Sequence, residues 1–123
     1  MWSYSQTSGL FLRNGVRAGA GYSGFGAGKN NPAMQNVPDV GPIPVGLYDI
    51  SGPYDVDMSG PHGPYIFKLN PHSDNQMFGR AGFLIHGDSI SNPGTASKGC
   101  IILARNIRES IEKDLDWILQ VIP

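Results

Sequence analysis

The chain has 123 residues, which suits one domain and leaves little room for a second. Charged residues make up 15% of it and the formal net charge is −1, so no strong field attracts nucleic acid or an anionic membrane surface. Its 17 glycines and 10 prolines lack the three-residue period of collagen, and 40% hydrophobic residues argue against disorder, so the composition fits many turns and short strands.

Short β-prone segments separated by glycine or proline occupy most of the chain. We expect strands at 2–5, 10–12, 16–22, 47–51, 65–69, 83–86 and 101–103. Asn14-Gly15 predicts a two-residue hairpin turn, because both central residues of such a turn must accept a positive φ. Segments 24–31, 52–64 and 87–99 are predicted loops.

One helix is predicted near the C-terminus. Asn106 can cap it, and Glu109 three residues later completes the spacing of a capping box. Residues at intervals of three or four would face the core, namely Ala104, Ile107, Ile111 and Leu115. Residues 117–122 are expected to form a closing strand. The sequence therefore predicts a mainly β, single domain over residues 1–123 with one helix in its C-terminal region.

The N-terminal residues do not read as a targeting or membrane segment. No basic residue precedes Arg13, and the first apolar run spans only 10–12, which is too short for a signal peptide or a transmembrane helix. We therefore expect no membrane insertion. The protein stays in the cytosol, leaves by a route without a cleaved signal, or is a processed domain.

One histidine and the single cysteine form the candidate catalytic pair. His86 ends an apolar strand, and Cys100 starts another one fourteen residues later, after a Ser-x-Gly turn. A thiol needs a nearby base to become a nucleophilic thiolate at neutral pH, and an imidazole can take that proton and return it to a leaving amine. The alternative interpretation is that a lone cysteine is an inert buried residue and a lone histidine a structural one.

The backbone around this pair suits the chemistry. Gly99 permits a tight turn, so that the amides of Gly99 and Cys100 can converge on a developing oxyanion. Ser97 can hold the turn by a hydrogen bond. The carbonyl of Gly87 can approach the second ring nitrogen of His86 and fix its tautomer.

Other polar residues are candidates for substrate contact. Asp88 can orient His86, contact substrate or simply form a turn, and Arg80 can bind a peptide carboxylate or be a plain surface charge. Tyr22 and Ser23 line the cleft only if the glycine-rich loop folds over it. The remaining histidines, His62 and His72, show no ligand-like spacing to His86, and one cysteine excludes a disulfide framework and a Cys-rich zinc site, so we expect no metal.

These motifs resemble a known family. Residues 83–88 (FLIHGD) and 97–103 (SKGCIIL) resemble the signature of the L,D-transpeptidase (YkuD-like) catalytic domain, which is His-Gly, a loop, Ser-His-Gly-Cys and a short apolar strand. Residues 41–48 (GPIPVGLY) look like its Thr-Pro-x-Gly-x-Phe/Tyr segment. Residues 21–32 and 76–80 look like a subgroup of type VI secretion effectors that carry this domain. The resemblance covers nearly the entire chain.

The resemblance implies a β-sandwich-like fold and a role for each motif residue. Cys100 would be the nucleophile and His86 the base, with Gly87 orienting His86, the amides of Gly99 and Cys100 forming the oxyanion hole, and Ser97 supporting the turn. The chain departs from the pattern at three positions, with Ile43 replacing Thr, Lys98 replacing the second His, and Ile102 standing where many relatives have Arg. Lys98 could contribute positive charge beside the thiol or contact substrate.

The resemblance also implies a function. The chain would be an L,D-carboxypeptidase or L,D-transpeptidase that exchanges the terminal D-amino acid of peptidoglycan stem peptides, with no cofactor. As an antibacterial effector, it would be secreted without a cleaved signal, would act in the periplasm of the target bacterium, and would have a secretion apparatus and a cognate immunity protein as partners. The alternatives are a housekeeping enzyme that crosslinks its own wall, and a catalytically inactive peptidoglycan-binding or structural module.

Overall fold

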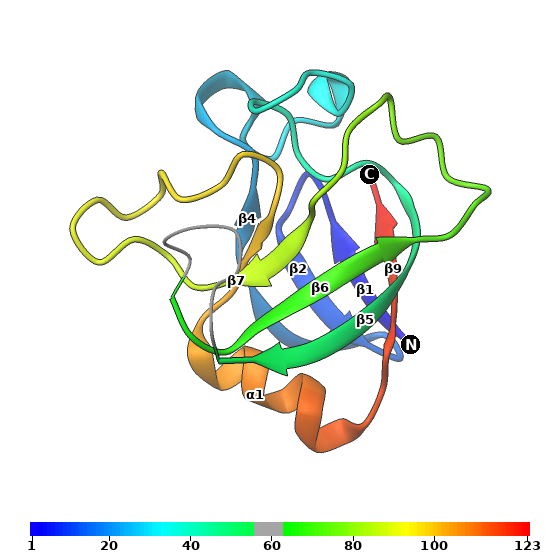
Figure 1. The fold of residues 1–123 in the computed structure, drawn as a ribbon, viewed down its shortest axis with the longest axis vertical. Coiled ribbons are helices and arrows are strands. Elements are labelled where there is room, and N and C mark those ends of the chain that lie inside the picture. Colours follow the sequence, from blue (N-terminus) through cyan, green and yellow to red (C-terminus); the bar gives the residue numbers. More distant parts are fainter. Residues whose placement is uncertain (56–62) are drawn as a thin grey trace.

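The computed structural model describes residues 1–55 and 63–123. In this part of the chain, nine strands form one sheet in the order β3-β2-β1-β9-β5-β6-β7-β8-β4 (Figure 1). The strands are β1 (Trp2–Ser5), β2 (Leu10–Arg13), β3 (Val16–Ala20), β4 (Tyr22–Ser23), β5 (Gly46–Tyr54), β6 (Ile66–Pro71), β7 (Leu84–His86), β8 (Ile101–Ile102) and β9 (Ile118–Ile122). The helices are α1 (Arg105–Asp114) and two short 3₁₀ turns, η1 (Gly26–Gly28) and η2 (Pro32–Met34).

The sheet curves until it nearly closes on itself. Its two edge strands, β3 and β4, are consecutive in sequence and are joined only through Gly21. A Cβ on Gly21 would collide with the carbonyl oxygen of Ile102 in β8, so glycine is required where the chain crosses from one edge to the other. This crossing brings β4 against β8, the strand that follows Cys100.

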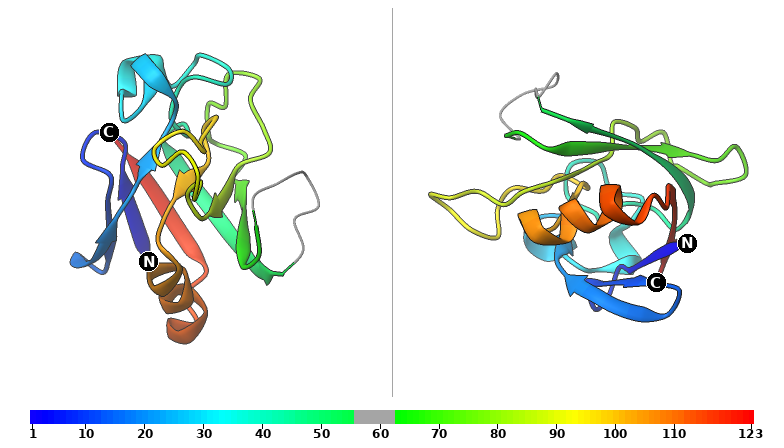
Figure 2. Two further views of the ribbon diagram at one scale, coloured as in Figure 1. Left: turned by 90° about the vertical axis from the view of Figure 1, so that its left-hand side faces the viewer. Right: turned by 90° about the horizontal axis from the view of Figure 1, so that it is seen from below.

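The core lies inside this curve. Buried side chains alternate with exposed ones along β9, as a sheet with one apolar face requires, and Trp2 stacks on Phe11 with ring centroids 4.9 Å apart. Helix α1 covers one end of the sheet, between its two halves (Figure 2), where Ile107 packs against Gly19. No helix in the described residues is long and apolar enough to cross a bilayer.

The predicted fold class is confirmed, since the chain is mainly β with a single α-helix in the C-terminal region. The two layers expected of a sandwich are the two halves of one curved sheet (Figure 2).

The Asn14-Gly15 turn is confirmed, with φ of +50° and +82°. The strand predicted over 16–22 splits at Gly21, and β5 runs on to Tyr54 through a predicted loop, of which 56–62 lie outside the described residues.

The predicted cap of α1 is wrong. The N-cap residue is Ala104, which offers no side-chain hydrogen bond, and Asn106 lies within the first turn. Ile107 and Ile111 are buried as predicted. Leu115, expected in the core, is 72% exposed. It ends the helix in a left-handed conformation with φ of +51°, so its side chain no longer follows the helical spacing of Ile107 and Ile111.

Candidate active site

Cys100 and His86 lie on neighbouring strands. Strands β7 and β8 are parallel, with Ile85 opposite Ile101, and Cys100 immediately precedes β8. The Sγ of Cys100 accepts a hydrogen bond from the amide of Leu84 at 3.3 Å, which places the sulfur beside β7, two residues along that strand from His86. An amide donor favours the thiolate over the neutral thiol.

The ring of His86 is fixed by its own loop. The side chain is only 1% exposed, and Nδ1 lies 2.8 Å from the carbonyl oxygen of Gly87. A carbonyl can only accept, so Nδ1 carries the proton in this hydrogen bond. In the neutral ring, Nε2 is therefore the nitrogen that can accept a proton.

The hydroxyl of Ser97 holds the turn that leads to Cys100. It donates to the carbonyl of Cys100 at 2.6 Å and accepts from the amides of Gly99 at 3.1 Å and Gly24 at 2.9 Å. The expected oxyanion pair needs correction here, because the Gly99 amide is directed to Ser97 within the turn. The amide of Cys100 stays the predicted oxyanion donor.

Ser23 supports the same turn from β4. Its side chain is 0% exposed, and its hydroxyl donates to the carbonyl of Gly99 at 2.8 Å while it accepts from the amide of Ile43 at 2.9 Å. The expectation that Ser23 contacts substrate is therefore wrong: its only hydroxyl is buried and engaged on both sides. Ser23 fixes β4 to the turn that carries Cys100.

Arg80 is buried behind this turn. It is 8% exposed, and Nη1 donates to the carbonyls of Gln35 at 2.7 Å and Pro42 at 2.8 Å. Nη2 donates to the carbonyls of Gly41 at 3.0 Å and Lys98 at 3.1 Å. These four hydrogen bonds make Arg80 a positioning residue that joins residues 35–42 to the turn before Cys100. Contact of Arg80 with a substrate carboxylate stays a prediction.

Arg80 also brings positive charge close to Cys100. Burial lowers its pKa, and the charges of Asp39, Tyr48 and Cys100 act in the opposite direction. A guanidinium keeps its proton throughout the usual pH range. Electrostatic coupling between Arg80 and Cys100 therefore favours the thiolate.

Tyr22 and Asp88 tie the loop after His86 to β4. The Tyr22 hydroxyl donates to Asp88 Oδ1 at 2.6 Å and accepts from the amide of Ala96 at 3.0 Å, while Asp88 accepts from the amides of Ser89 and Gly94. Burial and the Asp88 hydrogen bond raise the pKa of Tyr22 to about 12. Burial alone would raise the pKa of Asp88, but hydrogen bonds from Tyr22, Gly94 and Ser89 hold it below its usual value.

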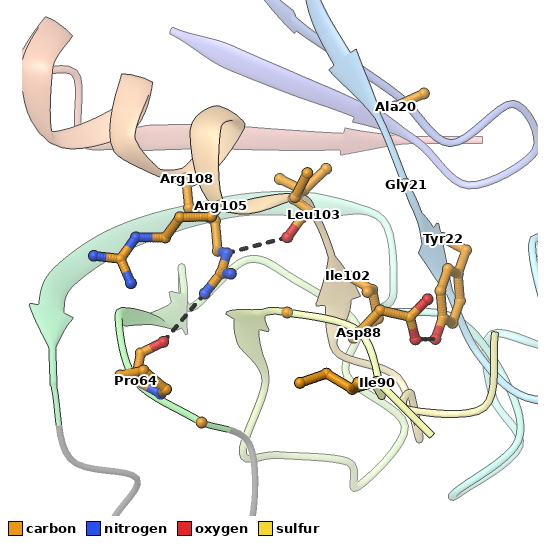
Figure 3. A pocket seen from close by; sticks show the side chains of 13 residues that line it. Ala20, Gly21, Tyr22, Pro64, Asp88, Ile90, Ile102, Leu103, Arg105 and Arg108 are labelled. Carbon is orange, nitrogen blue, oxygen red and sulfur yellow. Dashed lines mark hydrogen bonds between the residues drawn. The ribbon is translucent and has the colours of Figure 1, made fainter. Parts of the chain in front are cut away.

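Two cavities lie against this loop, and both are lined by Gly87 and Asp88. One, of about 600 Å³, is lined by His86, Gly87 and Asp88. The other, of about 570 Å³, is lined by Tyr22, Gly87, Asp88 and residues of α1 (Figure 3). Cys100 is not among the residues that line these two cavities.

Lys98 lies apart from both cavities. Its side chain is exposed and borders a third cavity, of about 230 Å³, together with Asp39 and Phe83. Within residues 1–55 and 63–123, no three His, Cys, Asp or Glu side chains are grouped to hold a metal ion. His72 contacts Asp49 at 3.0 Å, and His62 lies outside the described residues.

Sequence reasoning missed Arg108. It is 7% exposed, and its guanidinium reaches Gly87, the residue that orients His86. Its position three residues before Ile111 places it on the buried face of α1, which is the one signal that could have identified it.

Comparison with known protein families gives a match. No curated protein and no solved structure matches the chain. Residues 17–116, which include His86, Cys100 and the residues that hold their loops, match the model of the Tlde1 domain. That family is one of type VI secretion effectors of the L,D-transpeptidase type. The match covers most of the chain, which therefore belongs to the Tlde1 domain family.

Proposed function

We propose that this chain is a cysteine-dependent L,D-carboxypeptidase and L,D-transpeptidase acting on peptidoglycan stem peptides. The observation that carries the proposal is the placement of the Cys100 sulfur beside the strand that presents His86. The Gly87 carbonyl sets the tautomer of His86 so that Nε2 transfers the proton. Membership of the Tlde1 domain family supports the reaction type.

The reaction follows from these groups. The thiolate of Cys100 attacks the carbonyl carbon of the third-position diamino acid, and the oxyanion is received by the Cys100 amide. The C–N bond to the terminal D-alanine breaks as His86 gives its proton to the leaving amine, and a thioester remains. Water or the amine of a D-amino acid then attacks the thioester, His86 takes its proton, and the thiolate leaves. No step needs a cofactor.

The biological role is that of an antibacterial effector. Delivery by a type VI secretion apparatus would bring the enzyme to the periplasm of a target bacterium, where trimmed or exchanged stems can no longer donate crosslinks. A cognate immunity protein would protect the producing cell. The single cysteine means that no disulfide has to form at that destination.

Mass spectrometry of the products tests the reaction. Purified disaccharide tetrapeptide is incubated with the protein, with and without D-methionine. We expect tripeptides without the amino acid and methionine-substituted tetrapeptides with it, while Cys100→Ala gives neither. Turnover by Cys100→Ala, or intact tetrapeptide after incubation with the unmodified chain, would contradict the proposal.

Expression in a Gram-negative host tests the site of action. Export through a fused secretory signal is expected to arrest growth or lyse the cells, whereas the cytoplasmic form has little effect. The exported Cys100→Ala variant separates chemistry from export stress and should be harmless. Equal toxicity from both compartments, or toxicity of the alanine variant, would refute action on the wall.

A further inference from the structure

Within the described residues, the N-terminus of α1 has no partner for its first two amides. Its N-cap, Ala104, provides no side-chain hydrogen bond, and the first turn contains no acidic residue. Among the described residues, the amides of Arg105 and Asn106 have no acceptor. The start of a ten-residue helix therefore presents unsatisfied N–H groups and partial positive charge.

A buried guanidinium lies beside this helix end. Arg108, 7% exposed, donates through Nε to the carbonyl of Leu103 at 3.1 Å and through Nη1 to those of Pro64 at 3.2 Å and Tyr65 at 2.8 Å. Its other terminal nitrogen, Nη2, donates to no residue of the described part of the chain. Two N–H groups of a buried cation are thus left for a ligand.

The cavity of about 570 Å³ brings Arg108 and the first residue of α1 together. Arg108, Arg105, Ala104 and Gly87 all line it (Figure 3). Nη2 lies so close to Gly87 that a Cβ there would be 2.8 Å away, so glycine at this position admits the guanidinium. The Arg105 guanidinium lies over the Tyr65 ring, 4.1 Å from its centroid, so its charge is engaged there while the residue still borders the cavity.

The charges around the cavity favour a monoanion. Burial and the positive charge of Arg105 lower the pKa of Arg108, while Tyr65 and Glu109 act in the opposite direction. A bound anion would stabilise the guanidinium that burial disfavours. Asp88 lines the same cavity and is ionised at neutral pH, which disfavours a dianion such as phosphate.

We propose that this cavity binds a carboxylate, received by Nη2 of Arg108 and the first-turn amides of α1. Identification of the ligand as a free carboxylate of the stem peptide, or of the incoming D-amino acid, rests on the function proposed above. Because Gly87 and Asp88 line both this cavity and the one that contains His86, a carboxylate held here would fix the peptide relative to the base.

Binding to the Cys100→Ala chain tests the site without turnover. Nuclear magnetic resonance of the ¹⁵N-labelled variant follows the amides of Arg105 and Asn106 and the side-chain nitrogens of Arg108. Disaccharide tetrapeptide should shift these signals, and the same peptide with all carboxylates amidated should bind at least about tenfold more weakly. D-Methionine as a second probe assigns the site: shifts with it indicate the incoming amino acid, and shifts with the tetrapeptide alone indicate the stem. Signals unmoved by either probe would overturn the proposal.

A matched pair of variants gives an independent test. Ala104→Asn and Ala104→Asp both cap α1 and should raise the melting temperature. Only Asp adds a carboxylate at the cavity, and we expect it to weaken tetrapeptide binding about tenfold relative to Asn. Equal binding by the two variants would contradict the site.

The two proposals can fail separately. Turnover of tetrapeptide by the unmodified chain, with Arg105 and Arg108 signals unmoved in the Cys100→Ala chain, would remove the carboxylate site and leave the enzyme. Carboxylate-dependent shifts without turnover would leave the site and remove the proposed reaction.

Discussion

The guanidinium of Arg80 packs directly against Gly99, so that a Cβ on Gly99 would lie 2.6 Å from Nη2. Gly99 also has a φ of +130°, which side chains rarely adopt. The residue before the nucleophile is thus fixed both by its own backbone and by a buried cation behind it.

Replacement of Gly99 should therefore destabilise the fold. Gly99→Ala adds backbone strain and a clash with Arg80 and Phe83, and we expect the free energy of unfolding to fall by about 3 kcal/mol. Gly79→Ala is the matched control, since Gly79 has a φ of +70° but a Cβ added there would meet nothing within 4 Å. Urea unfolding measures both, and similar losses would mean that the Arg80 contact contributes nothing.

Removal of the Arg80 charge should slow the nucleophile. Arg80→Met loses the buried cation that is coupled to Cys100, so the apparent pKa of the thiol should rise and alkylation at pH 7 should slow. Arg80→Lys keeps the charge and should shift the pH profile of alkylation less. Circular dichroism checks that each variant is folded, and identical profiles in folded variants would argue against the coupling.

Lys98→Gln provides the contrasting case. Lys98 is exposed, so water and salt screen its charge, and we expect the pH profile of Cys100 alkylation to stay close to that of the unmodified chain. A shift as large as that of Arg80→Met would show that Lys98 replaces the family histidine as an activating group.

His86 is expected to carry proton transfer. His86→Ala should reduce turnover at neutral pH by about 10²–10⁴, the range for an acid–base group. The backbone at Leu84 and Gly87 should keep its position in this variant. Product formation by mass spectrometry over time gives the rate. A loss smaller than about tenfold would assign the base to another residue.

The Tyr22–Asp88 hydrogen bond should make the loop after His86 sensitive to pH. The pKa of Asp88 is lowered in the folded chain, so its contribution is present above its unfolded pKa and is lost as pH falls through the folded value. The pKa of Tyr22 is raised to about 12, so its contribution is complete below its unfolded pKa and is lost as pH rises toward 12. Hydrogen exchange of the Gly94 and Ala96 amides, which donate to this pair, should show greatest protection near neutrality.

Asp88→Asn is the control for that experiment. It removes the carboxylate that titrates and keeps an oxygen acceptor, so the loss of protection at acid pH should disappear while the alkaline limb remains. An acid limb unchanged by the substitution would assign it to another group.

Local patterns in the sequence were sufficient for much of the fold. The Asn14-Gly15 hairpin and the buried pair Ile107 and Ile111 follow from turn chemistry and helical spacing alone. The crossing at Gly21 could not be predicted from local patterns. The need for glycine there arises from the Ile102 carbonyl, eighty-one residues away. Periodicity reports which face of a strand is buried and says nothing of which edges meet.

Local sequence patterns were limited in the same way for the candidate site, since they do not show which distant residues come together. His86, Gly87, Ser97 and Cys100 lie in short motifs whose chemistry can be read directly. Ser23 and Arg80 belong to no such motif, and nothing in their local sequence indicates that they are buried. Their carbonyl partners come from distant parts of the chain, and only the tertiary fold reveals that they are buried.

The position of β9 has a consequence for synthesis of the protein. This strand lies between β1 and β5, so without it the sheet falls into two separate pieces. A ribosome makes Ile118–Ile122 after every residue of the catalytic pair and its supporting loops, so the nascent chain cannot complete its sheet until these residues have emerged. A chain that stops before Ile118 should accordingly show no cooperative urea transition. Cys100 would thus gain its ordered surroundings only after Ile118–Ile122 have left the ribosome, in a single late folding event.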